Sequence, residues 1–300
     1  VTGGTGFIGT NLTNELRSRG HEVYTLDIDF DADDRHYRAD IGEYRQLAEV
    51  FEDHDFDYVY NAAAEYGRWN GEDHYENLWS TNAVGTKHVL RLQTDHDFRL
   101  VQFSSAEVYG DESGRLTEPL TEQESIHLLN DYAMSKRVNE MQLENARQKF
   151  DTESVAVRPV NCYGPHIDYS EYRGVVQIFI WHALNDEPYT VHRGHSRIFD
   201  YVDDTVRTLS NIVENFHTGE VYNLGGNPEW ELSIEELSDL VLGYLDKDDS
   251  IVTYEESEPM TTEQKRIDSS NAIDHLDHDP RVPPSDGIHR TIDWFRAQYD

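Results

Sequence analysis

Cysteine occurs only once in this chain of 300 residues, at Cys162. A single cysteine excludes an intramolecular disulfide framework and is typical of a reducing compartment, so we expect a cytoplasmic location.

No stretch approaches the roughly 20 consecutive apolar residues of a membrane-spanning helix, and we expect no membrane span. The histidines show no matched set of ligand spacings; His275 and His278 lie in an acidic stretch. We therefore predict no metal site.

Basic residues are also scarce, because 25 Lys and Arg stand against 59 Asp and Glu, which gives a formal net charge of −34. A protein that approaches phosphates along a nucleic acid normally presents a basic face, so we expect no nucleic-acid partner. The acids are spread along the whole chain rather than gathered in one block, which is typical of a surface adapted to high salt. We hypothesise a halophilic protein that loses stability when screening salt is removed.

Strand-like and helix-like segments alternate through the first half of the chain. This alternation predicts an α/β fold with a doubly wound parallel sheet of the Rossmann type. We expect a first domain over residues 1–165, to which the chain returns at about 197–225, and a smaller α/β lobe over 166–300. The first strand is represented only by its last residues, so we expect a few residues to precede Val1. The expected strands cover residues 22–28, 58–60, 99–103, 154–158 and 221–224, and the expected helices 9–19, 43–52, 75–94, 131–150 and 175–184.

Three glycines, Gly3, Gly6 and Gly9, follow the end of the first strand and open the first helix. In this pattern the first glycine permits a tight turn, the second lets the backbone approach a pyrophosphate, and the third lets the helix pack closely on the sheet. The N-terminus of the helix would direct its dipole and free N–H groups at the phosphates. The stretch, which includes Phe7 and Ile8, therefore predicts a dinucleotide site.

An acidic residue, Asp27, ends the second strand about 20 residues after the glycines. A carboxylate there can hydrogen-bond an adenine ribose and repels a 2′-phosphate, which favours NAD over NADP. Asp40, followed by Ile41, is placed to meet the adenine amine, although capping of the next helix is nearly as good an interpretation. Small residues, Ala62 and Ala63, follow the third strand and would let a flat ligand lie against the backbone.

Tyr132 and Lys136 are four residues apart at the start of a predicted helix and so share one face. An ammonium group near a phenol lowers the pKa of the phenol, which would let Tyr132 act as a base. Ser105, at the end of the fourth strand, could polarise the substrate oxygen. Alone, such a Tyr–Lys pair is usually a surface feature; with the glycine turn and Ser105, catalysis becomes the better interpretation.

Together these motifs resemble the extended short-chain dehydrogenase/reductase family, and in particular its NAD-dependent nucleotide-sugar epimerases and dehydratases. The resemblance spans the chain through Gly3 to Gly9, Asn61-Ala62-Ala63, Ser104 to Gly110, Tyr132 to Lys136, Arg158 to Pro165, Tyr201 to Asp204 and Tyr222 to Gly225. It implies a catalytic set of Ser105, Tyr132 and Lys136, with Glu107 as a further candidate. It implies NAD contacts from Gly3, Gly6, Phe7, Ile8, Gly9, Asp27, Asp40, Ile41, Ala62, Ala63, Tyr132 and Lys136. Asn82 is a further candidate there, for holding the backbone of the site.

The resemblance also implies a nucleotide-sugar substrate, whose diphosphate would lie along Asn161 and Arg197. It implies oxidation at C4 with Tyr132 as base, and a homodimer formed through the helices at about 75–94 and 132–150. Ala106 stands where many 4,6-dehydratases carry an aspartic acid, which favours a 4-epimerase resembling those that act on UDP-glucose. Glu107 keeps a 4,6-dehydratase or a UDP-glucuronate decarboxylase open, and a sugar dehydrogenase or reductase is a third possibility.

A second departure from the family pattern lies at Glu258, near which such epimerases often carry an arginine for the diphosphate. A glutamate cannot replace that arginine. A standard diphosphate site therefore requires a substitute cation, for which the sequence offers Arg193, Lys265 and Arg266.

Overall fold

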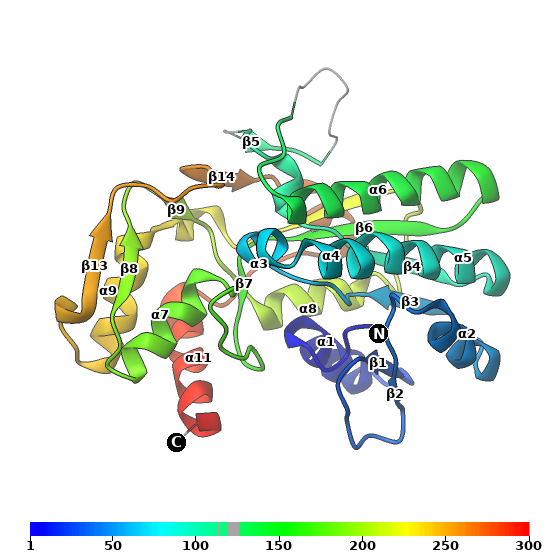
Figure 1. Cartoon of the computed structure of the whole chain (residues 1–300), viewed down its shortest axis with the longest axis horizontal. Coiled ribbons are helices and arrows are strands. Elements are labelled where there is room, and N and C mark those ends of the chain that lie inside the picture. The colour runs from blue at the N-terminus through cyan, green and yellow to red at the C-terminus, as the bar shows by residue number, and fades with distance from the viewer. Residues whose placement is uncertain (113–114, 119–125, 300) are drawn as a thin grey trace.

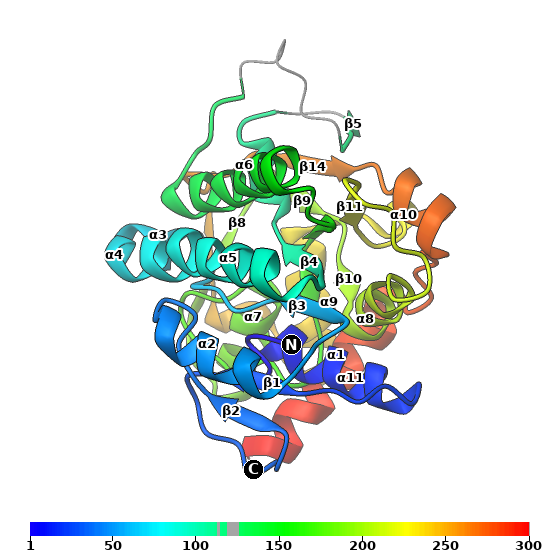
Figure 2. The same cartoon turned by 90° about the vertical axis from the view of Figure 1, so that its right-hand side faces the viewer.

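The computed structural model describes residues 1–112, 115–118 and 126–299, and it is built around one parallel sheet (Figures 1 and 2). Thr2 bridges Leu26 on one side and Asn61 on the other, so the first residues of the chain form the centre of this sheet. Its strands are β2 (His36–Arg38), β1 (Thr25–Asp27), the Thr2 segment, β3 (Tyr58–Asn61), β4 (Arg99–Phe103), β6 (Ser154–Pro159) and β11 (Val221–Leu224), in that order. All are parallel, which confirms the predicted Rossmann-type α/β fold.

Helices cover both faces of the sheet. On one face, Leu12 and Leu209 belong to an apolar cluster formed with α1 (Phe7–Ser18), α8 (Val202–Asn211) and α10 (Ser270–Leu276). On the other face, Leu47 and Leu143 belong to a cluster formed with α2 (Tyr44–Asp53), α5 (Thr86–His96) and α6 (Asp131–Phe150). Burial of both faces explains why β3, β4, β6 and β11 are buried at consecutive positions rather than at alternate ones.

The predicted helix over 75–94 differs from the structure. The helix expected over 75–94 consists of α4 (Tyr75–Leu78), a π-helical stretch (Trp79–Gly85) and α5, and π-helical turns are frequent at functional sites. After β3, the segment 65–73 contains the short helix α3 (Arg68–Asp73). Asn70 explains this turn, because its amide donates to the Glu65 carboxylate at 3.0 Å and to the Tyr66 carbonyl at 3.1 Å.

The later part of the chain forms a lobe beside the sheet, on the left of Figure 1. Its core joins Phe179, Val191, Leu237 and Ile292 from separate elements. These elements are α7 (Val175–Leu184), β8 (Tyr189–His192), α9 (Ile234–Leu245), β13 (Val252–Glu255) and α11 (Pro284–Tyr299). Short strands connect the lobe to the sheet: β5 (Arg115–Leu116), β7 (Cys162–Tyr163), β9 (Ser196–Arg197), β10 (Asp200–Tyr201), β12 (Leu232–Ser233) and β14 (Gln264–Ile267). The domain boundary at residue 165 stays a prediction.

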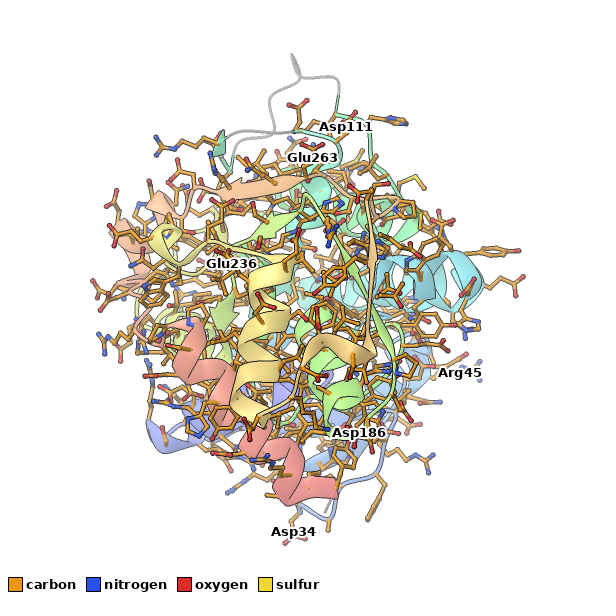
Figure 3. All side chains as sticks on the ribbon, turned by 90° about the vertical axis from the view of Figure 1, so that its left-hand side faces the viewer. Asp34, Arg45, Asp111, Asp186, Glu236 and Glu263 are labelled. Atoms are coloured by element: carbon orange, nitrogen blue, oxygen red, sulfur yellow. The ribbon has the colours of Figure 1, made fainter. Side chains whose placement is uncertain are left out.

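Acidic side chains occur across the face drawn in Figure 3, where the labelled acids lie on separate elements from top to bottom. All five of the labelled acids are exposed, namely Asp34, Asp111, Asp186, Glu236 and Glu263. Within the described part of the chain, no helix combines the length and the apolar character that crossing a membrane requires.

Candidate active site

A cavity of about 910 Å³ lies at the carboxyl ends of the parallel strands, between the sheet and the lobe. It is lined from both sides, by the glycine turn and the end of β4, and by α7 and β14. Ligands of doubly wound sheets bind at this edge, and the volume suits a bound cofactor and substrate.

The glycine turn lines one end of this cavity. Gly3 has a φ of +66°, and a Cβ on it would lie 2.7 Å from the Ala63 nitrogen; a Cβ on Gly9 would lie 1.9 Å from the Gly3 oxygen. Gly6 differs, because a Cβ there would meet only the Gly3 oxygen, at 3.3 Å, and would otherwise project into open space. Helix α1 begins directly after Gly6 without a side-chain cap. This open cradle and uncapped helix end fit a pyrophosphate.

Asp27 lies beside the glycine turn at the end of β1. Its carboxylate accepts hydrogen bonds from the main-chain nitrogens of Thr5, at 3.1 Å, and Ile28, at 2.8 Å. It therefore stabilises the turn as well as facing the cavity. Asp40 also lines the cavity, and its carboxylate accepts from the Gly42 nitrogen at 2.7 Å. The N-cap of α2 is Glu43, so Asp40 shapes the preceding turn instead of capping that helix.

Tyr132 and Lys136 project from the first turns of α6 into the cavity wall. The Lys136 ammonium donates to the Phe103 carbonyl at 3.0 Å and lies 5.7 Å from the centre of the Tyr132 ring. Burial lowers the pKa of Lys136 to about 8. Burial also raises the pKa of Tyr132, with smaller contributions from Tyr66 and Glu107, while the Ser105 side chain opposes the rise. In the protein without NAD the pKa of Tyr132 is therefore raised rather than lowered, because desolvation is the largest contribution.

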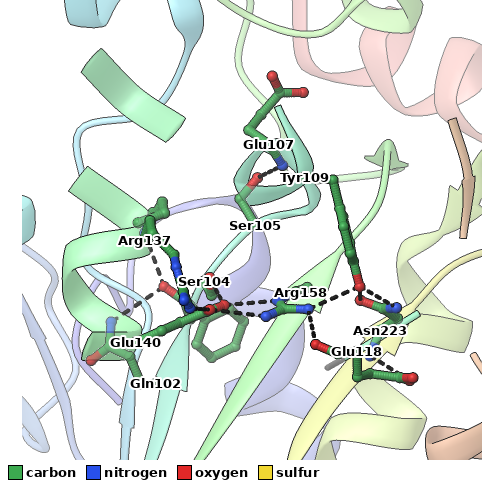
Figure 4. Close-up of polar contacts among 12 residues, drawn as sticks. Gln102, Ser104, Ser105, Glu107, Tyr109, Glu118, Arg137, Glu140, Arg158 and Asn223 are labelled. Carbon is green, nitrogen blue, oxygen red and sulfur yellow. Dashed lines mark hydrogen bonds and ion pairs between the residues drawn. The ribbon is translucent and has the colours of Figure 1, made fainter. Parts of the chain in front are cut away.

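Ser105 lies at the end of β4, where its hydroxyl accepts a hydrogen bond from the Glu107 nitrogen at 3.2 Å and caps a short 3-10 turn (Figure 4). Beneath this turn, the Arg158 guanidinium contacts both oxygens of Glu140, at 2.7 and 2.9 Å. Ser104 donates to the same carboxylate at 2.6 Å. This buried network holds the end of β4 against α6, so Ser105 and Tyr132 face the cavity from rigid elements.

Glu107, the other acid predicted here, is ion-paired with Lys265 of β14. Burial raises the pKa of the Glu107 carboxyl, but the Lys265 ammonium, together with the guanidinium groups of Arg68 and Arg197, lowers it by more, so the pKa is lowered overall. Lys265 is only 4% exposed. Burial lowers the pKa of Lys265, and the Glu107 carboxylate partly offsets this by raising it. The carboxylate is therefore held in its ionised form.

The predicted substrate residues lie on the lobe side of the cavity. Asn161 has a φ of +44°, and its amide donates to the Ile198 carbonyl at 3.0 Å. The Arg197 guanidinium donates only to neutral oxygens in the described structure: the Thr261 hydroxyl and the carbonyls of Ser196, Thr262 and Glu263. Burial lowers the pKa of Arg197. Arg197 is thus a buried cation that no carboxylate in the described residues neutralises directly.

One predicted cofactor residue, Asn82, does not line the cavity. It lies in the π-helical stretch behind the wall, where its amide exchanges hydrogen bonds with the main chain of Glu65, at 2.9 and 3.0 Å. It acts on the site by holding that backbone. All the other predicted site residues line the cavity; of the three substitute cations, Lys265 lines it, whereas Arg193 and Arg266 do not.

Several lining residues had no individual binding role assigned from the sequence. Arg68 of α3, Arg173 before α7 and Glu258 all face the cavity. The sequence signal for Arg68 was only its place in a polar, aromatic segment after β3, and its partners are far away in the chain. In the described residues, no group of three or more His, Cys, Asp or Glu side chains is placed to hold a metal ion.

The profile of the NAD dependent epimerase/dehydratase family matches residues 1–225. The chain belongs to this family. Among its relatives, UDP-glucuronic acid decarboxylase 1 of Xenopus tropicalis is 30% identical, over 100% of this chain and 72% of the relative. The structure of dTDP-glucose 4,6-dehydratase from Streptomyces venezuelae, with NAD bound, is 25% identical, with a TM-score of 0.87 over 99% of this chain and 96% of that one.

The structure of UDP-glucose 4-epimerase from Thermotoga maritima is similar in fold, with a TM-score of 0.89, 24% identity and coverage of 100% of this chain and 98% of the other. The names of these similar proteins thus describe three different outcomes of nucleotide-sugar chemistry: decarboxylation, dehydration and epimerisation. The cofactor is NAD, and the open Gly6 cradle, the uncapped end of α1 and Asp27 fit it.

Proposed function

We propose that this protein is an NAD-dependent 4-epimerase of a nucleotide-activated sugar. The observation that carries the proposal is the state of the residues beside Tyr132. Ala106 provides no acid for the departure of water, and the Glu107 carboxylate is engaged by Lys265 with a lowered pKa. A carboxylate that is ionised and paired is a poor proton donor. The chemistry left to the site is oxidation at C4 and return of the hydride to the other face.

In this proposal Tyr132 removes the proton from the C4 hydroxyl, and Ser105 hydrogen-bonds the same oxygen. NAD, when bound, accepts the C4 hydride and returns it. Its positive charge and the nearby Lys136 would favour the phenolate, which burial disfavours in the protein alone. The ketone then turns within the cavity, and Tyr132 returns its proton to the oxygen.

Decarboxylation of a nucleotide-activated uronic acid is the second candidate. The observation that favours it is Lys265, a buried cation on the cavity wall. Lys265 could bind a sugar carboxylate if its ion pair with Glu107 opened. A 4-keto uronic acid is a β-keto acid, so carbon dioxide can leave without a further acid or base. The 30% identical decarboxylase makes this outcome worth testing directly.

The deciding experiment incubates the protein and NAD, in molar salt, with UDP-glucose, UDP-glucuronate and dTDP-glucose, and analyses the products by chromatography and mass spectrometry. Epimerisation gives an isomer of unchanged mass with no net NADH. Loss of carbon dioxide or water moves the function to a lyase, and accumulating NADH moves it to a dehydrogenase. Tyr132→Phe is the control, with an expected loss of at least about 10²-fold in kcat and retained NAD binding.

Glu107→Gln tests whether Glu107 only pairs with Lys265 or acts as a general acid or base. If Glu107 only pairs with Lys265, kcat falls less than about tenfold; a general acid or base at this position would cost about 10²- to 10⁴-fold. A large loss confined to kcat would therefore contradict epimerisation by hydride return alone.

We further propose that residues 1–165, with the return at about 197–225, hold NAD, that residues 166–300 bind the nucleotide, and that the protein is a homodimer. Exposed apolar side chains on the adjoining π-helix and α6 support the dimer; they belong to Val84, Met134 and Met141. Sedimentation of the wild type against Met141→Glu tests it: the variant should sediment as a monomer, and an unchanged dimer would place the interface elsewhere.

A further inference from the structure

Arg68 connects the two sides of the cavity. It is the first residue of α3, on the sheet side, and its guanidinium lies 2.7 Å from the carboxylate of Glu258, which follows β13 in the lobe. The same guanidinium approaches the carbonyls of Pro259, at 3.5 Å, and Met260, at 3.4 Å. Both side chains line the cavity and are about one-quarter exposed. The pair therefore lies at the solvent-accessible side of the site.

Glu258 begins a segment that is held above the cavity by side chains from the lobe. Its main-chain nitrogen donates to Nε2 of His195 at 3.2 Å, and Nδ1 of the same ring lies 3.1 Å from the Thr262 carbonyl. Arg197 binds the next turn through Thr261 and Thr262. The backbone is anchored independently of the Glu258 carboxylate, so that carboxylate can release Arg68 without loss of the segment.

Further guanidinium groups lie near the pair. Arg197, which has no carboxylate partner in the described structure, is close enough to Arg68 and Glu258 for both to act on its pKa. Arg173 lies across the Tyr66 ring, 6.0 Å from its centre, and directly precedes the N-cap of α7, which has no side-chain cap. Arg173, Gly174 and Val175 all line the cavity. Three guanidinium groups and a free helix N-terminus therefore face one volume, which is the chemistry of a diphosphate site.

We propose that Arg68 is a further substrate-binding residue and that Glu258 is its internal counterion, which the diphosphate of the nucleotide sugar displaces. This inference rests on the proposed function, since it takes the diphosphate from the nucleotide-sugar substrate. In the free protein Glu258 neutralises Arg68. When a nucleoside diphosphate enters, its oxygens bind the planar guanidinium in two-point fashion, and the Glu258 carboxylate turns to solvent. Glu258, which stands where an arginine was expected, thereby sets the affinity of the site rather than abolishing it.

Binding, not turnover, tests this exchange. The probes are UDP and uridine, titrated calorimetrically into the NAD-loaded protein at one fixed salt concentration. Glu258→Gln leaves Arg68 without its competitor, so UDP should bind roughly three- to tenfold more tightly. Arg68→Gln should weaken UDP binding about tenfold. Uridine, which has no phosphate, should bind all three proteins equally.

Glu15→Gln is the matched control for the loss of one negative charge. Glu15 pairs with Arg19 at 2.7 Å with similar exposure, and it does not line the cavity. This variant should leave the affinity for UDP unchanged. Unfolding curves establish that each variant is folded.

Four results would overturn the exchange: unchanged or weaker UDP binding by Glu258→Gln, equal tightening by Glu15→Gln, weakening of uridine along with UDP by Arg68→Gln, or no UDP binding by any of these proteins. The product analysis described above is independent of these titrations. If the protein is an epimerase and its affinity for UDP does not change in Glu258→Gln, the proposed function holds and the counterion exchange is refuted.

Discussion

Lys265 and Glu107 form an ion pair inside the cavity although 158 positions separate them in the chain. Glu107 belongs to the turn after β4, whereas Lys265 belongs to β14. The pair therefore joins the sheet edge to the lobe at the point where the sugar is expected.

Replacing Lys265 by Met leaves the Glu107 carboxylate largely buried without its cation. We expect the free energy of unfolding to fall by about 3 kcal/mol, because breaking a buried pair costs more than removing both members. The double variant Glu107→Gln with Lys265→Met should recover part of the loss. Denaturant unfolding of the two single variants and the double variant measures this coupling. Strictly additive losses would contradict a coupled pair.

Replacing Asp27 by Ala removes a carboxylate that both faces the cavity and accepts from the Thr5 nitrogen in the glycine turn. We expect NAD to bind about 10- to 100-fold more weakly, and the preference for NAD over NADP to narrow. Fluorescence titration with both cofactors measures the change. Asp29→Ala is the control, because Asp29 also lines the cavity and carries the same charge. Equal losses in both variants would assign the effect to net charge.

Asp200 is buried beneath the cavity beside Cys162, and one of its oxygens accepts from Thr205 at 2.6 Å. Burial raises the pKa of this carboxyl from 3.8 to about 7. Between these two pH values the folded protein keeps a proton on Asp200 that the unfolded chain releases. The contribution of Asp200 to the free energy of unfolding is therefore fully present below about pH 3.8 and is lost as the pH rises toward 7. Asp200→Asn should flatten this decline and stabilise the protein by about 3 kcal/mol at pH 8. Wild-type and variant curves that stay parallel from pH 4 to 8 would contradict it.

The net charge of −34 predicts a strong dependence of stability on salt. Repulsion among exposed acids is screened only when the Debye length is short, about 3 Å at 1 M salt against about 10 Å at 0.1 M. We expect Tm to rise steadily from 0.1 M to 3 M KCl. Equal Tm values across that range would refute the halophilic hypothesis, and sucrose of matched water activity controls for osmotic effects.

Features that depend on short-range interactions could be predicted from the sequence. The predicted helix 131–150 coincides with α6, and the predicted strands 99–103 and 221–224 coincide with β4 and β11. Tyr132 and Lys136 share a face because an α-helix places residues four apart together. The glycine turn was readable because Gly3, Gly6 and Gly9 lie close together in the chain, and the steric demand at Gly9 is local: a Cβ there would lie 1.9 Å from the Gly3 oxygen.

Contacts between side chains that are distant in the chain depend on the tertiary fold and could not be predicted. Lys265 reaches Glu107 and Arg68 reaches Glu258, 190 positions away, because the lobe folds back over the sheet edge; no local periodicity records such pairs. The π-helical turn that aims Asn82 at the Glu65 backbone also depends on packing. The raised pKa of Tyr132 has the same origin, since desolvation depends on everything that surrounds the side chain and not on its neighbours in sequence.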